Sequence, residues 1–493
     1  MKRDLVRIRL EPLAVEFDAP RDASLLSSLA AHGIEFPCGG EGICGGCRVR
    51  VLTGWLPITS ADREHFSPDQ LSQGWRLACK ARATEPLVIE CEQWRMNVLT
   101  DVSPLTGAGR AGLGIAIDLG TTTIAAQMID MTTGAVLGVG TMLNPQSTWG
   151  ADVMSRIRAV LEGADLTRVI REGLAGMISK LAGGREHEIT EVVLVGNTVV
   201  HHLFCGLPVE PLAHVPFASP GLGEQRLQAK DLGWQLPESC AIRFAPCIGG
   251  FVGADILAGI VAVGMAHSDE LVALIDLGTN GEIAIGNRDG VVCASTAAGP
   301  AFEAGAIRMG MRAVTGAISH VSLAGGRMQA TVVGDVPPRG ICGSGLVDAV
   351  AAGLRSKSIL ASGRIADGSK VFPIAKPVSL WQSDIRELQL AKGAIAAGFK
   401  LLLRHVGADV PQLKSVYLAG AFGNYVQIDS AIAIGLLAAP KEIIQAAGNT
   451  ALRGAKMLLM QSEGPCLPEM RHISLAAEPG FEDEFAACMA FPG

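Results

Sequence analysis

A chain of 493 residues is too long for one compact domain and predicts two to four. Hydrophobic residues make up 49% and charged residues 18%, which excludes wholesale disorder, and a net charge of −7 makes nucleic acid an unexpected partner. The N-terminus alternates charged and apolar residues without a secretory signal, and the most apolar stretch, 256–266, is too short to span a bilayer. We therefore expect a cytoplasmic protein without a membrane partner.

Residues 1–91 predict a small domain of their own. Apolar residues alternate with polar ones over 6–10 and again over 13–17, which predicts two strands. A short helix is expected over 24–32, capped by Asp22 or Ser24, and two more strands over 48–52 and 87–90. This order of hairpin, helix, loop and strand fits a β-grasp ferredoxin domain. Residues 92–111 follow as a predicted linker.

Four cysteines in this domain have the pattern of a metal-cluster site. Cys38, Cys44 and Cys47 are spaced C-x5-C-x2-C, and Cys79 follows after 31 residues. A [2Fe–2S] cluster needs thiolate ligands around two irons, so several must come from one tight loop. Glycine at five of the seven intervening positions permits positive φ angles there. A zinc site would more often show two C-x2-C pairs or a histidine pair, so the sequence predicts a [2Fe–2S] cluster.

Cys91 is the alternative fourth ligand. It is expected to lie beyond the last strand, whereas Cys79 ends the segment Arg76-Leu-Ala-Cys79. That segment resembles the fourth-ligand segment of the [2Fe–2S] ferredoxins of the adrenodoxin and putidaredoxin type. The spacing departs by one residue from the plant-type C-x4-C-x2-C pattern, which leaves the cluster type unchanged. The resemblance favours Cys79.

From Leu113 onward, apolar strands alternate with Ala-rich helices, and one segment is repeated. The segment around Asp118 returns around Asp276, which is 158 positions later (276 minus 118). A repeat of this length implies a duplicated two-lobed α/β fold. We expect the first lobe over 112–270 and the second over 271–493.

Each copy of the repeat ends in a loop suited to phosphate. A glycine lets the backbone approach a phosphate, and the following residues supply hydroxyl and amide donors. The acidic residue at each strand end, Asp118 or Asp276, would hold Mg²⁺ through water and is the predicted catalytic group. A single D-x-G-T turn is often an ordinary hairpin, but its recurrence favours ATP binding. The predicted phosphate contacts are Gly120, Thr121, Thr122, Thr123, Gly278, Thr279 and Asn280.

Two further glycine-rich segments predict nucleotide contacts. Residues 416–425 form an apolar strand ending in a glycine-rich turn, where Gly420, Gly423 and Asn424 would border adenosine. Gly343, Ser344 and Gly345 open a helix whose N–H groups could hold an anion. With the repeated loops, these segments resemble the ASKHA superfamily (acetate and sugar kinases, Hsp70, actin) over about residues 113–460.

Four other polar residues keep open roles. His201 and His202 are adjacent on an expected helix and point about 100° apart, so a shared metal is not expected. Asp255 could contact Mg²⁺ or water, and Glu303 could face the nucleotide, a partner or solvent.

The strings GNTVVHH, AAGPAFEAGAI and ICGSGLVDAV, together with the ferredoxin and ASKHA parts, resemble the family of reductive activators of corrinoid proteins. The resemblance covers essentially the whole chain. It implies ATP-dependent reduction of the corrinoid protein of a methyltransferase system from cob(II)amide to cob(I), with a [2Fe–2S] cluster, ATP and Mg²⁺ as cofactors. An unidentified low-potential electron donor and a homodimer are also implied. Larger relatives carry an extra middle domain, and we expect this chain to lack it because only about 20 residues separate its two parts.

Two other functions stay open. One is activation of another low-potential enzyme, as 2-hydroxyacyl-CoA dehydratase activators do, although those hold a [4Fe–4S] cluster between subunits and lack a ferredoxin domain. The other is a redox-regulated ASKHA kinase acting on a small molecule, for which no catalytic base or polar substrate pocket can be assigned.

Overall fold

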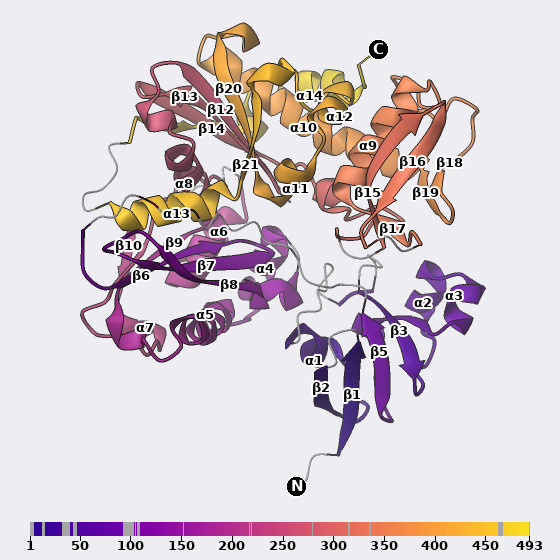
Figure 1. The fold of residues 1–493 in the computed structure, drawn as a ribbon, viewed down its shortest axis with the longest axis horizontal. Helices are drawn as coiled ribbons and strands as arrows, with labels where there is room; N and C mark the ends of the chain where they lie inside the picture. Colours follow the sequence, from indigo (N-terminus) through magenta and orange to yellow (C-terminus); the bar gives the residue numbers. More distant parts are fainter. Residues whose placement is uncertain are drawn as a thin grey trace.

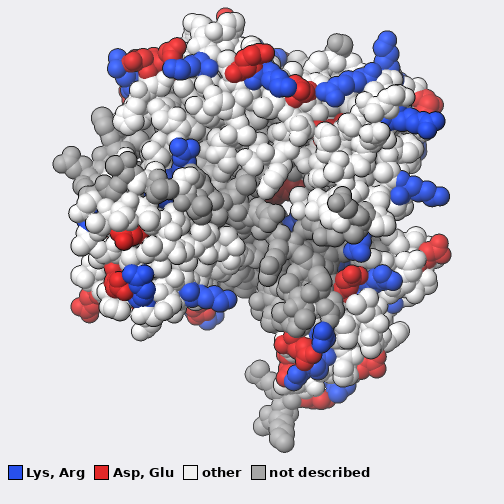
Figure 2. Space-filling view, in the orientation of Figure 1, with Lys and Arg blue, Asp and Glu red and all other residues white. Residues whose placement is uncertain are grey.

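The computed structural model describes residues 4–11, 15–31, 40–42, 47–91, 103, 105, 109–150, 152–215, 217, 219–278, 280–313, 316–334, 337–461 and 467–492. Figure 1 shows a small N-terminal domain beside two larger sheet-and-helix lobes. Among the described helices, none has the length and apolar character needed to cross a membrane. On the face drawn in Figure 2, Lys and Arg side chains are interspersed with Asp and Glu side chains.

The N-terminal domain is a five-stranded sheet in the order β2-β1-β5-β3-β4. The first two strands form the predicted antiparallel hairpin, and β1 also pairs in parallel with β5. Alternation along β1 buries Val6, Ile8 and Leu10 in the domain core, as the sequence predicts. The elements are β1 (Leu5–Glu11), β2 (Val15–Pro20), α1 (Leu26–Ala31), β3 (Arg48–Thr53), α2 (Ser60–His65), α3 (Pro68–Ser72), β4 (Trp75–Leu77), η1 (Ala78–Lys80) and β5 (Leu87–Cys91).

Two details of this domain refine the sequence predictions. The helix begins at Leu26, two residues later than expected, because the Ser24 hydroxyl accepts the N–H of Leu26 before the helix starts. The expectation that Cys91 lies beyond the last strand is wrong. Strand β5 runs through Cys91, which pairs with Val49 of β3.

The two larger lobes confirm the predicted duplication. Each contains a six-stranded sheet in which three consecutive antiparallel strands are followed by parallel neighbours. The first sheet has the order β10-β11-β9-β6-β7-β8 and the second β21-β20-β12-β13-β14-β22. The strands are β6 (Leu113–Leu119), β7 (Thr123–Asp130), β8 (Val136–Leu143), β9 (Ile189–Val195), β10 (Gln225–Leu227), β11 (Ala241–Phe244), β12 (Leu271–Leu277), β13 (Gly281–Asn287), β14 (Gly290–Thr296), β20 (Leu413–Ala419), β21 (Ile444–Gly448) and β22 (Met470–His472).

Helices cover the two sheets and also fill the space between them. Helices α8 (Ala254–Ala262) and α13 (Thr450–Met460) pack against each other between the sheets (Figure 1). Helix α13 belongs to the C-terminal half but packs on β6 and β9, so it ties the two lobes together. The other helices of the lobes are α4 (Val153–Leu161), α5 (Leu166–Ala182), α6 (Thr198–Cys205), α7 (Ala229–Leu232), α10 (Gln382–His405), α11 (Gly420–Tyr425), α12 (Ile428–Ala433) and α14 (Phe481–Met489).

The second lobe carries an additional subdomain at its outer end. It combines a three-stranded sheet in the order β16-β15-β17 with helix α9 and a two-stranded hairpin. Helix α9 is the predicted helix that opens at Gly343, and it packs on β15. The elements are β15 (Ala317–Ala324), β16 (Arg327–Val332), β17 (Gly340–Ile341), α9 (Gly343–Arg355), β18 (Val371–Ala375) and β19 (Val378–Trp381).

Candidate functional site

The described part of the cysteine site brings two of the four predicted ligands together. Cys47 precedes β3 and Cys79 follows β4, and the pairing of these strands places the two cysteines side by side. The backbone N–H of Cys79 donates to Sγ of Cys47 across 3.4 Å, and both residues are buried. Such hydrogen bonds stabilise metal-bound sulfur. Cys38 and Cys44 lie outside the described residues, so the full ligand set stays a prediction.

Two glycines of the cysteine loop adopt the predicted backbone conformation. Gly40 and Gly42 have φ angles of +94° and +81°. A Cβ on Gly40 would lie 2.3 Å from a Leu26 methyl carbon, and one on Gly42 would lie 2.6 Å from Lys80 Cε. The left-handed backbone conformation, with a neighbouring side chain close by, therefore favours glycine at both positions. A loop that packs this tightly beside two buried cysteines fits a [2Fe–2S] cluster.

A cleft of about 650 Å³ lies between the two lobes and is lined by both copies of the repeat. The two repeated loops therefore face the same cleft. Of the other predicted nucleotide residues, Gly345, Gly423 and Asn424 are absent from the described lining, and Thr279 lies outside the described residues. The predicted residues that line the cleft are Asp118, Gly120, Thr121, Thr122, Thr123, Asp276, Gly278, Asn280, Gly343, Ser344 and Gly420.

The first loop is held in place by side chains that the sequence did not single out. The Asn144 amide donates to the Gly120 carbonyl across 2.9 Å, and the Asn197 amide donates to the Thr121 hydroxyl across 2.8 Å. The Arg156 guanidinium, which is fully buried, donates to the Thr121 carbonyl. A loop anchored from three elements keeps its donors directed into the cleft.

Five carboxyl groups line the cleft, and four of them, Asp118, Asp255, Asp276 and Glu282, are close enough to influence one another's pKa. Burial raises the pKa of Asp118 from 3.8 to about 6, although the Asn449 amide donates to its carboxylate across 2.9 Å. Burial and the neighbouring Asp118 raise the pKa of Asp276 to about 7. Burial, with Asp276 nearby, likewise raises the pKa of Asp255 to about 7, and the pKa of Glu282 is raised well above its ordinary range. The cleft thus brings together acidic groups whose negative charge its own side chains do not fully balance.

This donor set fits a hydrated magnesium ion. Among the described residues, no three His, Cys, Asp or Glu side chains converge closely enough to ligate one metal directly. Mg²⁺ commonly keeps several waters and binds one or two carboxylates together with phosphate oxygens. Arg312 is the one Lys or Arg in the described lining, against five carboxyl groups, so a divalent cation would supply positive charge that the lining lacks.

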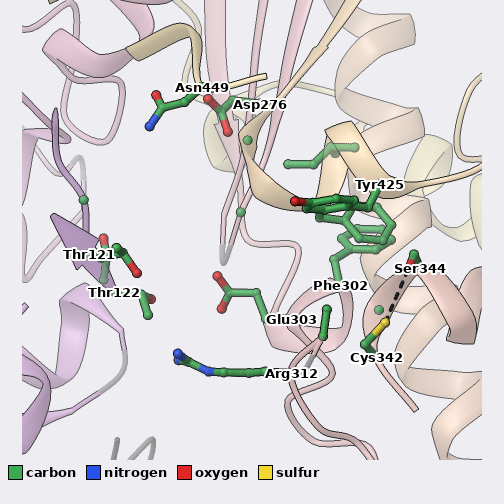
Figure 3. Close-up of a pocket in the computed structure, with 18 of the residues that line it drawn as sticks. Thr121, Thr122, Asp276, Phe302, Glu303, Arg312, Cys342, Ser344, Tyr425 and Asn449 are labelled. Carbon is green, nitrogen blue, oxygen red and sulfur yellow. Dashed lines mark hydrogen bonds between the residues drawn. The ribbon is translucent and has the colours of Figure 1, made fainter. Parts of the chain in front are cut away.

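The other end of the cleft is aromatic. Phe302 and Phe422 stack with their centroids 4.7 Å apart, and the exposed Tyr425 ring lies near them (Figure 3). Figure 3 also shows Glu303 and Arg312 projecting toward Thr121 and Thr122 on the opposite wall. Carboxylates at one end and aromatic rings at the other suit a ligand with a charged tail and a flat apolar group.

The predicted glycine-rich turn after β20 is wrong, because helix α11 begins there at Gly420. Gly420 has a φ angle of +81°, and a Cβ on it would lie 2.7 Å from an Asp276 carboxylate oxygen. Gly420 alone changes the chain direction, and helix α11 then brings Phe422 and Tyr425 to the cleft.

The structure separates the four residues whose roles were open. His201 and His202 lie on α6 in the interior, and His202 hydrogen-bonds the Pro208 carbonyl and the Ser219 hydroxyl. Burial lowers the pKa of His201 to about 4, so its ring is neutral where it packs on Phe244. Asp255 and Glu303, in contrast, both line the cleft.

Comparisons with known proteins agree with this arrangement. Residues 8–84 match the family model of the 2Fe-2S iron-sulfur cluster binding domain, residues 113–268 that of the RACo middle region, and residues 270–493 that of the C-terminal domain of RACo, the ASKHA domain. The expectation that this chain lacks the middle domain of its relatives is therefore wrong, because the first lobe matches the middle-region model.

Three relatives extend over most of the chain. The corrinoid activation enzyme RamQ of Eubacterium limosum is 35% identical over 430 residues, covering 79% of this chain and 72% of that protein. The [Co(II) methylated amine-specific corrinoid protein] reductase of Methanosarcina barkeri is 29% identical, covering 71% of this chain and 70% of that protein. A solved structure of a reductive activator for corrinoid, iron-sulfur protein is 26% identical with a TM-score of 0.67, covering 99% and 98% of the two chains. The chain therefore belongs to the family of reductive activators of corrinoid proteins, in which a [2Fe–2S] domain is joined to an ASKHA-type ATPase fold.

Proposed function

We propose that this protein uses ATP to deliver electrons to the corrinoid protein of a methyltransferase system, returning its cobalt from the cob(II) to the cob(I) state. The observation that carries the proposal is the presence, on one chain, of a cluster-binding domain and a two-lobed cleft with duplicated acidic loops. Relatives named for corrinoid activation match both parts together. A small-molecule kinase would not require the cluster domain.

The cluster domain supplies the electron. Cys38, Cys44, Cys47 and Cys79 would hold a [2Fe–2S] cluster, which carries one electron at a time. Plant-type clusters have potentials near about −400 mV, and each ~59 mV of uphill one-electron transfer costs a factor of ten in the equilibrium constant. An acceptor of still lower potential therefore needs a second source of free energy. An external low-potential donor must also load the cluster.

The cleft supplies that free energy. Thr121, Thr122 and Thr123 would bind phosphates from the first lobe, and Asp118 and Asp276 would hold Mg²⁺ through water. The aromatic end, with Phe422 and Tyr425, would border the nucleoside. Because phosphate contacts come from both lobes, binding favours the closed arrangement, and hydrolysis releases it.

We further propose that the protein is a homodimer, which sedimentation velocity would test.

The raised pKa values make nucleotide binding depend on pH. Mg²⁺ needs ionised carboxylates, and the pKa of Asp276 near 7 means that protons compete with the metal below neutral pH. The apparent Kd of a non-hydrolysable ATP analogue with Mg²⁺ should rise about tenfold from pH 8 to pH 6 for one competing proton. Calorimetry at the two pH values measures this change, and binding without Mg²⁺ is the control. A Kd that stays constant over this range would refute a role for these carboxyl groups in holding the metal.

The proposed function is tested with the partner itself. The reduced protein is mixed with a corrinoid protein in the cob(II) state, with and without Mg-ATP. We expect the Co(I) absorption band to appear only with Mg-ATP. Phosphate transfer to a metabolite, in place of free phosphate release, would instead support a kinase. Electron delivery to another enzyme but to no corrinoid protein would support the activation of another low-potential enzyme.

A further inference from the structure

The cluster domain contacts both lobes close to the nucleotide cleft, and one of these contacts is made by the residue that follows a predicted cluster ligand. Arg48 directly follows Cys47 at the start of β3. Its guanidinium donates to the backbone carbonyl of Arg308 in the second lobe across 3.2 Å. It also lies 5.7 Å above the Phe66 ring, which belongs to the core of the cluster domain. Arg48 is therefore held on its own domain while it reaches the other.

The acceptor, Arg308, sits in the middle of a segment that lines the cleft. Phe302 and Glu303 precede it and Met311 and Arg312 follow it, and all four line the cleft. A movement of this segment against a bound nucleotide would therefore displace the Arg308 carbonyl as well. Figure 3 shows that two of these side chains, Glu303 and Arg312, extend into the space between the walls.

Arg308 itself is fixed to the body of the second lobe. Its N–H donates to the Asp384 carboxylate across 3.1 Å at the start of α10, and its guanidinium lies 5.1 Å above the Trp381 ring. Between it and Glu303, Ala304 and Ala306 both have φ angles of +59°, a left-handed conformation that residues other than glycine rarely adopt. Arg308 therefore joins the 302–313 segment to the body of the second lobe, while its carbonyl bonds the cluster domain.

The first lobe is contacted from the same domain. Helix α1 lies beside η2 (Pro145–Trp149), the short helix that directly follows Asn144. Asn144 is the residue whose side chain and backbone bond the Gly120 and Thr122 carbonyls of the first phosphate loop. The cluster domain thus contacts both lobes, once within the 302–313 segment and once at the helix that follows the residue bonded to the first phosphate loop.

We propose that Arg48 is a positioning residue that transmits the state of the nucleotide cleft to the cluster domain through the Arg308 carbonyl. The inference rests on the proposed function, because it assumes that the cleft binds nucleotide. When the lobes close on a nucleotide, the 302–313 segment moves relative to η2. Because the cluster domain contacts both, its position relative to the two lobes must change. By thermodynamic linkage, the position of the cluster domain then alters nucleotide affinity by the same factor by which bound nucleotide alters that position's equilibrium.

Hydrogen exchange of the full cluster-loaded chain tests this, with and without a non-hydrolysable ATP analogue and Mg²⁺. In the parent protein we expect exchange to change threefold or more both in 302–313 and in 47–53. In Arg48→Ala the change should persist in 302–313 and disappear from 47–53. The matched control is Arg50→Ala, two residues along the same strand, whose guanidinium bonds the Gln73 carbonyl within the cluster domain. It should behave as the parent does.

Arg48 adjoins a predicted cluster ligand, so a second variant disturbs the same contact from the second lobe. Arg308→Ala removes one of the two contacts that fix the acceptor, the stacking on Trp381, and it leaves the residues of the cluster domain unaltered. It should uncouple 47–53 in the same way. If 47–53 still responds in both variants, or fails to respond in the parent while 302–313 does, the inference is wrong and the proposed function stands. If the analogue changes exchange nowhere in the parent, the nucleotide site itself is wrong.

Discussion

Asp276→Asn is expected to lower the rate of ATP hydrolysis, and with it the rate of corrinoid reduction, by about 10- to 100-fold. A carboxylate that holds Mg²⁺ through water acts as an outer ligand, and losing such a group typically costs this factor in affinity or activity. Asparagine keeps the shape of the side chain but removes its charge. Since burial and Asp118 already raise the pKa of Asp276 to about 7, the site tolerates a neutral side chain there without unfolding. Phosphate release and Co(I) absorbance measure the two rates.

A matched control at a surface aspartate tests whether the loss of rate is specific to the charge of Asp276. Asp289 lies in the turn between β13 and β14 of the same sheet, is exposed, and pairs with Arg288 across 3.9 Å. Asp289→Asn should leave both rates within about twofold of the parent. If Asp276→Asn also stays within that range, Asp276 is not part of the catalytic site.

Cys79→Ser is expected to abolish the [2Fe–2S] signal and reduce cob(I) formation to the rate seen without protein, while the Kd of the ATP analogue stays within twofold. Iron in these clusters is held by thiolates, and Cys79 is buried against the sulfur of Cys47. The nucleotide cleft is built from other elements, so its affinity should survive. Absorption and EPR spectra of the reduced protein report the cluster, and calorimetry reports the nucleotide.

Two other cysteines provide the comparison for Cys79. Cys240 is equally buried in the first lobe, where burial raises the pKa of its thiol to about 12, so Cys240→Ser should leave the cluster unchanged. Cys91 is the rival ligand, and Cys91→Ser should also keep the cluster. Loss of the cluster in Cys91→Ser and its retention in Cys79→Ser would overturn the ligand assignment without affecting the proposed function.

Local patterns in the sequence were sufficient to predict most of the fold. The alternation along β1 can be read within a few residues, and the segment around Asp118 recurs around Asp276 as a short, recognisable pattern. The same holds for Gly40 and Gly42, whose positive φ angles follow from the tight loop. Such features depend on neighbours in sequence, so a single sequence reveals them.

Contacts between distant segments could not be predicted in this way. Asn449 reaches Asp118 from 331 residues away, and Arg48 reaches Arg308 from 260 residues away. Arg156 looks like an ordinary surface residue of an amphipathic helix until the fold buries it under the Thr121 loop. Their roles depend on which elements meet, and one sequence holds no signal for that.

The central claim is that ATP hydrolysis and electron delivery are coupled in this one chain. The most direct test follows phosphate release and Co(I) absorbance in the same sample as a cob(II) corrinoid protein is added to the reduced protein with Mg-ATP and an excess of a low-potential reductant. The account predicts that both signals rise together, and that omitting ATP or using the non-hydrolysable analogue leaves cobalt as cob(II) under multiple-turnover conditions. Formation of cob(I) at the same rate without ATP, or steady phosphate release with no cob(I), would contradict it.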